Sequence, residues 1–522
     1  MRHWLIVFLV TLLVSSLATA QEHVFRFANS ADVLTMDPHG ALVVQTQMVQ
    51  GFVYEGLTRI NQRLGFEPAL AESYARIAPD VWRFKLRGNV RFHDGSQLTA
   101  DDVVFSVRRA ISQKSAIRGI ISTISDARKI DDATVDIATS RPNPILDRDL
   151  PLLYIISKPW AEAHGATEPI DFRFGADNFA VNHANGTGPF VLKERIAGER
   201  TVLMRNPGWW DVAPGNVTEA VFRPIRSAPT RMAALLSGTI DMMEPVPVQD
   251  IEHLARTPGF KVLRGPQARV IYIGLDQMHD ELPEASVKGR NPFRDVRVRR
   301  ALYEAIDVET IRHSVLHDNS TPTAVPFWPG AQGYTAALDE RLSFDPAAAR
   351  RLLAEAGYPD GFEVGMDCAN DRDVSPEEIC QAIAGMLAQI GVKVSVAVRP
   401  TSQFLAKVLG HKSSLYVSGW LDATFDALNP LSGLIATPKN GRGPLNGGGY
   451  SNPELDALID RIEVEDDPAK RQQAVDQAVR LYRDDVAQIP LHHQWLAWGM
   501  KATVELVQTP DDIMRLQWVT VK

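Results

Sequence analysis

Two carboxylates follow an aromatic side chain at the end of an expected strand, in a pattern suited to holding a cationic solute. Residues 415–417 have the composition of a strand, and Gly419, Trp420 and Asp422 come directly after it, with Asp426 beyond. An aromatic face beside carboxylates binds ammonium or guanidinium groups in sites that are otherwise mostly apolar. We therefore expect a substrate-binding site at these four residues.

The sequence lacks the spaced motifs of common enzymes. It contains no phosphate loop of the G-x-x-x-x-G-K-[ST] type, no G-x-S-x-G elbow and no H-E-x-x-H pair. We therefore assign no catalytic residue and expect a protein that is not an enzyme. A secreted hydrolase stays open as a less favoured alternative, because a catalytic group can be assembled from distant residues.

Three histidines raise the question of metal binding. His492 and His493 are adjacent, and neighbouring side chains on an extended segment point to opposite faces, so we do not expect them to share an ion. Together with His411 they motivate a second alternative, a protein that binds a nickel chelate or haem. We assign no metal ligand and no cofactor.

The two cysteines lie in one expected β-α-β unit. Cys368 ends a strand that begins at Phe362, and Cys380 falls in the second turn of a helix that starts at Ser375-Pro376, with Ser375 as N-cap. We expect a disulfide between the two cysteines; two separate buried thiols are the alternative. A metal site is disfavoured because further ligands are missing nearby.

The elements that must position these residues alternate between helices and strands. Helices are expected to begin at Thr99, at Asp345-Pro346 and near Pro468, each with a capping residue or an early proline. Alternating or apolar runs predict strands at 81–86, from 191 onward, and at 261–263, 270–275 and 415–417. This mixture throughout the chain predicts α/β lobes.

Length and charge limit the classes of function. The chain has 522 residues, with 55 Lys and Arg against 63 Asp and Glu, a net charge of −8. Such a length predicts roughly two to four domains, and the acidic balance argues against a nucleic-acid partner.

The first twenty residues have the pattern of a secretory signal peptide. Arg2 provides a positive start, residues 4–14 are apolar, and Ala18-Thr19-Ala20 is a cleavage sequence. An N-terminal membrane anchor is the alternative. Residue 21 is Gln rather than Cys, so we expect a product that is not lipidated and is soluble in the periplasm.

Ordered motifs over nearly all of the remaining chain resemble one family. Residues 82–109 (WRFKLRGNVRFHDGSQLTADDVVFSVRR) are similar to the signature of the peptide/nickel class, family 5, of extracytoplasmic solute-binding proteins of bacterial ABC importers. The further matches, in chain order, are TMDP at 35–38, YEGL at 54–57, GTGPF at 186–190, NPGWW at 206–210, RMAALLSGTID at 231–241, DVRVRRALYEAID at 295–307, ARRLLAEAGYPDGF at 349–362 and YSNP at 450–453.

The resemblance implies a two-lobed periplasmic-binding-protein fold that closes on a solute. Lobe one would comprise residues 21–275, with a subdomain at about 59–188, and lobe two residues 276–494, after which 495–522 return to lobe one. Two crossover hinges are expected, near 272–275 and 491–499. The implied partners are a peptide or related small solute and the permease subunits of an importer, bound by a monomer.

The resemblance also suggests which side chains line the site. Dipeptide- and oligopeptide-binding members place an Asp three residues after the Gly-Trp pair, where this chain has Ala423, with Asp422 one position earlier. Asp426 matches another acidic position of the family. The basic residue that binds the peptide carboxylate in dipeptide-binding members lies just before the helix that ends at Gly391; this chain has Pro376-Glu377-Glu378 there, with Arg372 several residues upstream. We expect Asp37, Asp422, Asp426 and Arg372 at the rim.

Overall fold

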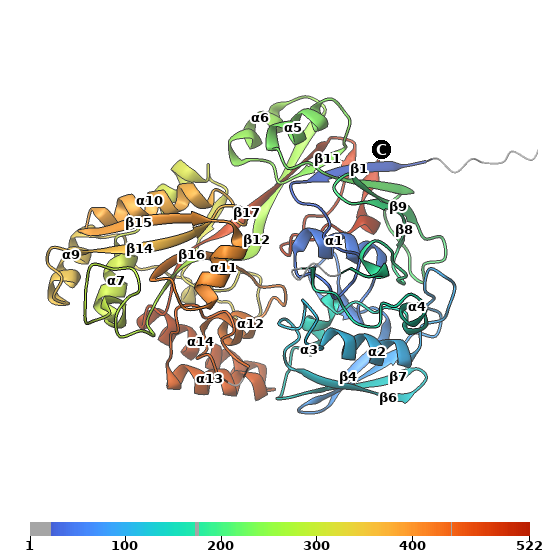
Figure 1. Ribbon diagram of the computed structural model, residues 1–522, viewed down its shortest axis with the longest axis horizontal. Coiled ribbons are helices and arrows are strands. Elements are labelled where there is room, and N and C mark those ends of the chain that lie inside the picture. The colour runs from blue at the N-terminus through green and yellow to red at the C-terminus, as the bar shows by residue number, and fades with distance from the viewer. Residues whose placement is uncertain (1–21, 173–176, 440) are drawn as a thin grey trace, which may run out of the picture.

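The computed structural model describes residues 22–172, 177–439 and 441–522 (Figure 1). The expected signal peptide at 1–20 lies outside the described residues. Two α/β lobes lie side by side, and long strands run between them. The expected two-lobed fold with two crossovers is confirmed.

One mixed sheet of 11 strands extends through both lobes. Ten strands form its path, and β13 (Ser320–Pro322) pairs beside that path with β17 (Ile489–Lys501). The path runs in the order β15 (Val392–Arg399), β14 (Phe362–Ala369), β16 (Leu415–Leu421), β12 (Phe260–Leu275), β17 (Ile489–Lys501), β11 (Met242–Glu244), β1 (Val24–Asn29), β10 (Glu219–Pro224), β9 (Arg200–Arg205) and β8 (Phe190–Ile196).

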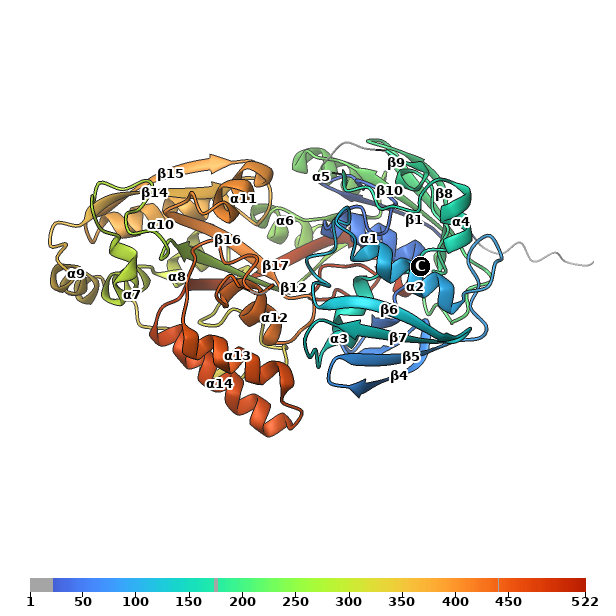
Figure 2. The same ribbon diagram turned by 60° about the horizontal axis from the view of Figure 1, so that its bottom comes forward.

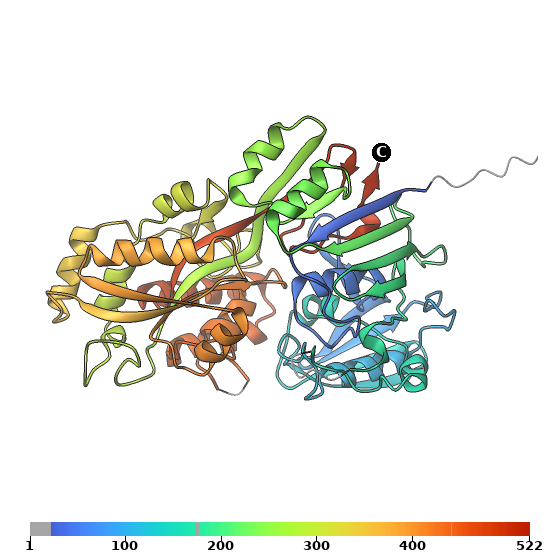
Figure 3. The same ribbon diagram turned by 45° about the horizontal axis from the view of Figure 1, so that its top comes forward.

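The crossovers are the paired strands β12 and β17, seen side by side between the lobes in Figure 3. Their antiparallel register runs from Phe260↔Lys501 to Pro266↔Trp495, shifts, and resumes at Val270↔His493. The sequence predicted two strands, 261–263 and 270–275, where the structure has one strand of 16 residues. Residues 267–269 break the alternating pattern because they form an irregularity within the strand, not its end.

Lobe one combines its part of the large sheet with a smaller layer. A four-stranded antiparallel sheet has the order β4 (Ala71–Ala78), β5 (Val81–Leu86), β7 (Thr134–Thr139) and β6 (Ile124–Asp131), and lies at the bottom of this lobe in Figure 1. Helix α2 (Ala100–Ala110) covers it with Val103 and Val107, both fully buried. As expected, α2 begins after Thr99, whose N–H donates to Asp102 Oδ2 at 2.9 Å.

The remaining elements of lobe one are the two-stranded pairs β2 (Thr58–Ile60) with β3 (Phe66–Pro68) and β18 (Val504–Glu505) with β19 (Thr520–Val521), and helices α1 (Val44–Val53), α3 (Leu146–Asp149), α4 (Lys158–Ala163), α5 (Ala228–Leu236) and α6 (Ile251–Arg256).

Lobe two covers both faces of β14, β15 and β16 with helices. The predicted starts at Asp345 and Pro468 are confirmed, because α9 begins at Pro346 and α14 at Pro468. Ser375 does not cap α10 as predicted: its φ is 48° and its side chain accepts no capping hydrogen bond. The helices of this lobe are α7 (Val296–Glu304), α8 (Val308–Thr310), α9 (Pro346–Glu355), α10 (Pro376–Ala388), α11 (Thr401–Leu409), α12 (Leu428–Pro430), α13 (Pro453–Val464) and α14 (Pro468–Asp484).

The hydrophobic core is divided between the lobes and also bridges them. Buried Ile271, Ile273 and Val417 face α10, whereas Val270 and Tyr272 face the helices from α12 to α14 because side chains alternate across a strand. The hydrophobic cluster that contains Val270 and Tyr272 also includes Ile60 and Ile145 of lobe one. The lobes therefore contact each other through β2 and the segment before α3, and Arg76 of β4 pairs with Asp466, which lies between α13 and α14. Figure 2 shows these elements on the facing sides of the two lobes.

Candidate solute-binding site

The predicted Trp420–Asp422 segment lies where β16 ends beside the irregularity in β12. Trp420 pairs with Val270, and the Asp422 N–H donates to Ala268 O at 2.8 Å. The Ala268 N–H donates in turn to Pro510 O, at 2.7 Å, in the C-terminal segment of lobe one. One residue of the crossover thus connects the end of β16 to the opposite lobe.

Asp422 is a buried carboxylate with one oxygen available. Oδ1 accepts hydrogen bonds from Thr424 N at 3.1 Å and Thr424 Oγ1 at 2.9 Å, but no described group donates to the buried Oδ2. Burial raises the pKa of Asp422 to about 7. A carboxylate in this state can be stabilised by a cation that reaches Oδ2.

Trp420, near the end of β16 and two residues before this carboxylate, is half-buried. Its Nε1 donates to Asn429 Oδ1 at 3.0 Å, and its ring packs against the cluster that includes Phe425 and Leu431. The indole is therefore held in one orientation.

Asp426 has a different environment from the one expected at the rim. Arg471 binds both of its oxygens, with Nη2–Oδ1 at 2.8 Å and Nη1–Oδ2 at 3.2 Å, inside lobe two. The Leu428 N–H also donates to Oδ1, at 2.9 Å. Because this carboxylate is fully buried and engaged, it shapes its own turn and has no oxygen to offer a solute.

Asp37 likewise lies in the interior of lobe one and not at the rim. Arg109 donates to both of its oxygens, at 2.7 and 2.6 Å, and the backbone N–H groups of His39 and Ile170 donate to it as well. Burial alone would raise the pKa of Asp37, but the charge and hydrogen bonds of Arg109 outweigh it and hold that pKa below its usual value. Both oxygens of Asp37 are therefore occupied by groups of its own lobe.

Arg372 and Gly419 lie together at the edge of β16. Arg372 Nη2 donates to Gly419 O at 2.7 Å. The neighbouring Asp373 accepts from Arg269 Nη1 at 3.2 Å, and Arg269 Nε donates to Gln267 Oε1 at 3.1 Å. Sequence reasoning missed Arg269 and Asp373, because only the folded chain brings them beside Gly419, Arg269 through the β12–β16 pairing and Asp373 from the loop after β14.

The three histidines do not converge. His492 and His493 are buried on β17, and burial lowers their pKa values to about 3 and about 4. The ring of His411 is hydrogen-bonded to Gly447 O at 3.0 Å. Among the described residues, no group of three or more His, Cys, Asp or Glu side chains is arranged to hold a metal ion.

Cys368 of β14 and Cys380 of α10 form a disulfide, with S–S at 1.99 Å and the Cα atoms 6.7 Å apart. Both residues are buried in the cluster that packs α10 on the sheet. The bridge ties the strand to the helix next to the loop that carries Arg372.

A comparison of sequences decides the family. The model of the bacterial extracellular solute-binding proteins, family 5 (middle region), matches residues 65–441. The chain belongs to this family. It is a solute-binding protein, and this membership accounts for the two lobes, the crossovers and the ordered motifs of the sequence.

Individual relatives cover nearly the whole chain. The glutathione-binding protein GsiB of Salmonella typhimurium is 26% identical over 478 residues, which are 89% of this chain and 88% of the relative. Among solved structures, DppA of Helicobacter pylori in complex with the peptide STSA has a TM-score of 0.78 at 22% identity, covering 96% of this chain and 98% of that one. AppA of Bacillus subtilis in complex with a nonapeptide has a TM-score of 0.79 at 20% identity, covering 96% and 99%.

Across residues 22–172, 177–439 and 441–522, every helix is too short or too polar to span a lipid bilayer.

Proposed function

We propose that this protein is a periplasmic, non-enzymatic binding protein that captures a peptide or related amine-bearing solute between its lobes and delivers it to the permease of an ABC importer. It acts as a monomer and needs no cofactor. Residues 1–20 direct export, 21–275 with 495–522 form one lobe, and 276–494 form the other. Closure of the lobes removes water from the solute, which strengthens its charge pairs.

The observation that carries this proposal is the unpartnered Oδ2 of buried Asp422. An ammonium group placed there would pair with a carboxylate that is otherwise costly to ionise. Trp420, two residues earlier, offers an aromatic face to the same cation. Asp422 has no exposed surface, so a solute reaches it while the lobes are apart and is enclosed when they meet.

The ligands of the relatives agree with this chemistry. GsiB is named for glutathione, and the solved structures contain the peptide STSA, a nonapeptide and Met-Leu. Peptides of this kind carry an ammonium group and at least one carboxylate. The side chain of Arg372 is 24% exposed. We assign Arg372 to a solute carboxylate, with Gly419 as the neighbouring backbone contact.

Calorimetric titration of the secreted chain with glutathione, Met-Leu and STSA tests the proposal. We expect at least one to bind without product release, and Asp422→Asn to weaken that binding at least tenfold, since a charge-assisted hydrogen bond is lost. Asp126→Asn is the matched control, because Asp126 is exposed and pairs with Arg108 on the four-stranded sheet. Absence of binding to all three peptides, with native mass spectrometry showing no co-purified amine, would rule the proposal out, and steady product release would favour a hydrolase.

A further inference from the structure

Arg148 of lobe one extends into lobe two and binds the turn that follows Asp422. Its Nη1 donates to Phe425 O at 3.1 Å and to Thr424 O at 3.5 Å, and its Nη2 donates to Gln332 Oε1. Nη1 also lies 3.7 Å from Asp426 Oδ2. Within the described residues, each acceptor of this guanidinium belongs to lobe two.

The lobe-one carboxylates beside Arg148 have other partners. Asp147 Oδ2 accepts from Tyr74 OH at 3.2 Å, and Asp149 Oδ2 accepts from Asn143 Nδ2 at 2.8 Å. The guanidinium is thus held in an acidic environment without being tied to either neighbour. It is available to the acceptors of the opposite lobe.

Aromatic packing accompanies these hydrogen bonds. The Arg148 guanidinium lies over the ring of Phe66, 5.3 Å from its centroid, and Phe66 meets Phe425 edge-on at 5.9 Å. Phe425 has a φ of 52°, in the left-handed region that residues with side chains rarely adopt. Such a conformation persists only where its surroundings hold it, and here some of those surroundings belong to lobe one.

The 422–427 turn is short and is bonded to Gln332, which lies outside it in lobe two. The Gln332 N–H donates to Phe425 O, and the Ala427 N–H donates to Gln332 O. Asp426, bound by Arg471 from lobe two, fixes the far end of the turn, and Asp422 forms the near end. Asp422 accepts hydrogen bonds from Thr424, the residue before Phe425, so a displacement of Phe425 bears directly on the groups around Asp422.

We propose that Arg148 is a positioning residue that couples lobe closure to the conformation of the 422–427 turn. Docking of Arg148 on the carbonyls of Thr424 and Phe425 holds the turn in the form that buries Asp422. Separation of the lobes withdraws the guanidinium and Phe66 together and relaxes the turn. By linkage, a solute held at Asp422 favours the docked position of Arg148, and docking favours the solute; this part rests on the proposed function.

Hydrogen–deuterium exchange of the wild-type protein and of Arg148→Ala tests the coupling without any solute. We expect amides at 422–428 to exchange on the order of tenfold faster in Arg148→Ala, because hydrogen bonds to a charged donor are lost. Amides of β14 should be unchanged. Arg148→Lys should give an intermediate rate, since a lysine keeps the charge but not the planar fork.

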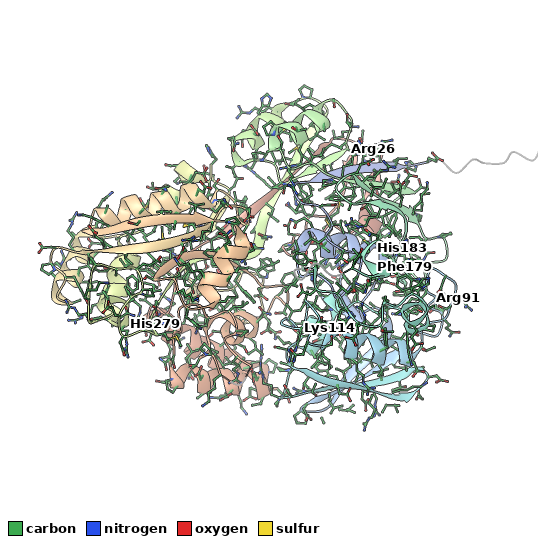
Figure 4. The ribbon with its side chains drawn as sticks, in the orientation of Figure 1. Arg26, Arg91, Lys114, Phe179, His183 and His279 are labelled. Atoms are coloured by element: carbon green, nitrogen blue, oxygen red, sulfur yellow. A yellow bond between two sulfur atoms is a disulfide. The ribbon has the colours of Figure 1, made fainter. Side chains whose placement is uncertain are left out.

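Arg91→Ala is the matched control. Arg91 is also an arginine of lobe one, but it lies at the outer edge of that lobe (Figure 4) and donates to Gly95 O at 2.9 Å. It should leave exchange at 422–428 unaltered. Equal exchange at 422–428 in the wild type and Arg148→Ala overturns the proposal, and so does faster exchange throughout the protein, since that would be a general loss of stability.

Calorimetry with a peptide that binds the wild type adds a second measurement. Arg148→Ala should weaken binding by several-fold although Arg148 does not touch Asp422, and Arg91→Ala should not. If no probe peptide binds the wild type and no amine co-purifies with it, the proposed function fails, but the exchange result still decides the role of Arg148. Normal exchange with weakened binding would make Arg148 a direct solute contact and would also contradict the proposal.

Discussion

Arg109 binds Asp37 through both terminal nitrogens, at 2.7 and 2.6 Å, in the fully buried interior of lobe one. The pair connects the TMDP segment to helix α2, and the Arg109 guanidinium also contacts His39 Nδ1 at 3.0 Å. These contacts make Asp37 a structural residue of lobe one.

Replacing Asp37 with Ala should lower the free energy of unfolding by about 3–5 kcal/mol, because it leaves the Arg109 charge buried without its partner.

Since the pKa of Asp37 is lowered in the folded protein, the stabilisation that Asp37 provides is present above its unfolded pKa and is lost as the pH falls through the folded value. Urea unfolding measures both effects. The control Asp126→Ala should cost less than about 1 kcal/mol, as expected of an exposed pair. Weakened peptide binding in folded Asp37→Ala would instead assign Asp37 to the site.

Asp422 should give peptide binding a pH dependence. Its pKa is raised to about 7 in the folded protein, and an ammonium group binds the ionised form, so affinity should fall by up to about tenfold per pH unit below that value. Titration calorimetry across this range checks the slope. The slope should disappear in Asp422→Asn, and a slope that survives the substitution would assign the titration to another group.

Asp422 should also make the stability of the solute-free protein depend on pH, with the opposite sign to its effect on peptide binding. A carboxyl group whose pKa is raised on folding stabilises the protein fully below its unfolded pKa, and this contribution is lost as the pH rises through the folded value. Asp422→Asn should therefore be more stable than the wild type at alkaline pH, by on the order of a few kcal/mol, when no solute is added. Thermal unfolding at acidic and alkaline pH is the measurement, and a destabilised variant at alkaline pH would contradict the assignment.

Removal of the Cys368–Cys380 disulfide should destabilise lobe two by about 3 kcal/mol, as estimated for the short loop that it closes. The double variant Cys368→Ala/Cys380→Ala can be compared with the reduced wild type by urea unfolding. Both should show a similar loss, since each lacks the same cross-link. An unchanged unfolding midpoint in both would show that the packing of α10 on β14 is sufficient by itself.

Gly419→Ala should disturb the edge of β16. A Cβ at this position would lie 2.8 Å from Asp373 Oδ1 and 3.0 Å from Ile271 Cδ1, so the neighbours must move, at a cost of roughly 1–3 kcal/mol. Because Arg372 donates to the same residue, we also expect weaker binding of a carboxylate-bearing peptide. Gly88→Ala, where no atom lies within 4 Å of the added Cβ, is the control; equal thermal unfolding of the two variants would contradict this account.

The sequence predicted the start of a helix well where a few consecutive residues determine it. Asp345 and Asp467 each precede a proline, and each caps its helix with a side-chain oxygen, because the capping geometry depends on only a few consecutive residues. Prediction failed at Ser375, which has the right residue type but a left-handed backbone. The chain leaving β14 enters α10 through a turn whose direction is imposed by the surrounding fold.

The site was harder to predict because the role of each charged side chain depends on partners that lie far away in the sequence. Asp422 and Asp426 look equivalent in sequence, but Arg471 binds only the second. The same holds for Asp37, whose partner lies 72 residues away. No local pattern marks Arg148 or Arg471 as the residues that contact the 422–427 turn.

The pairing of β12 with β17 has a consequence for how the protein resists degradation. Both segments that pass from lobe to lobe are hydrogen-bonded to each other, and proteases cleave backbone that can leave its hydrogen-bonded partners. Limited digestion should therefore cut surface loops within each lobe before it severs either connection. Nicked molecules would then keep their two lobes attached.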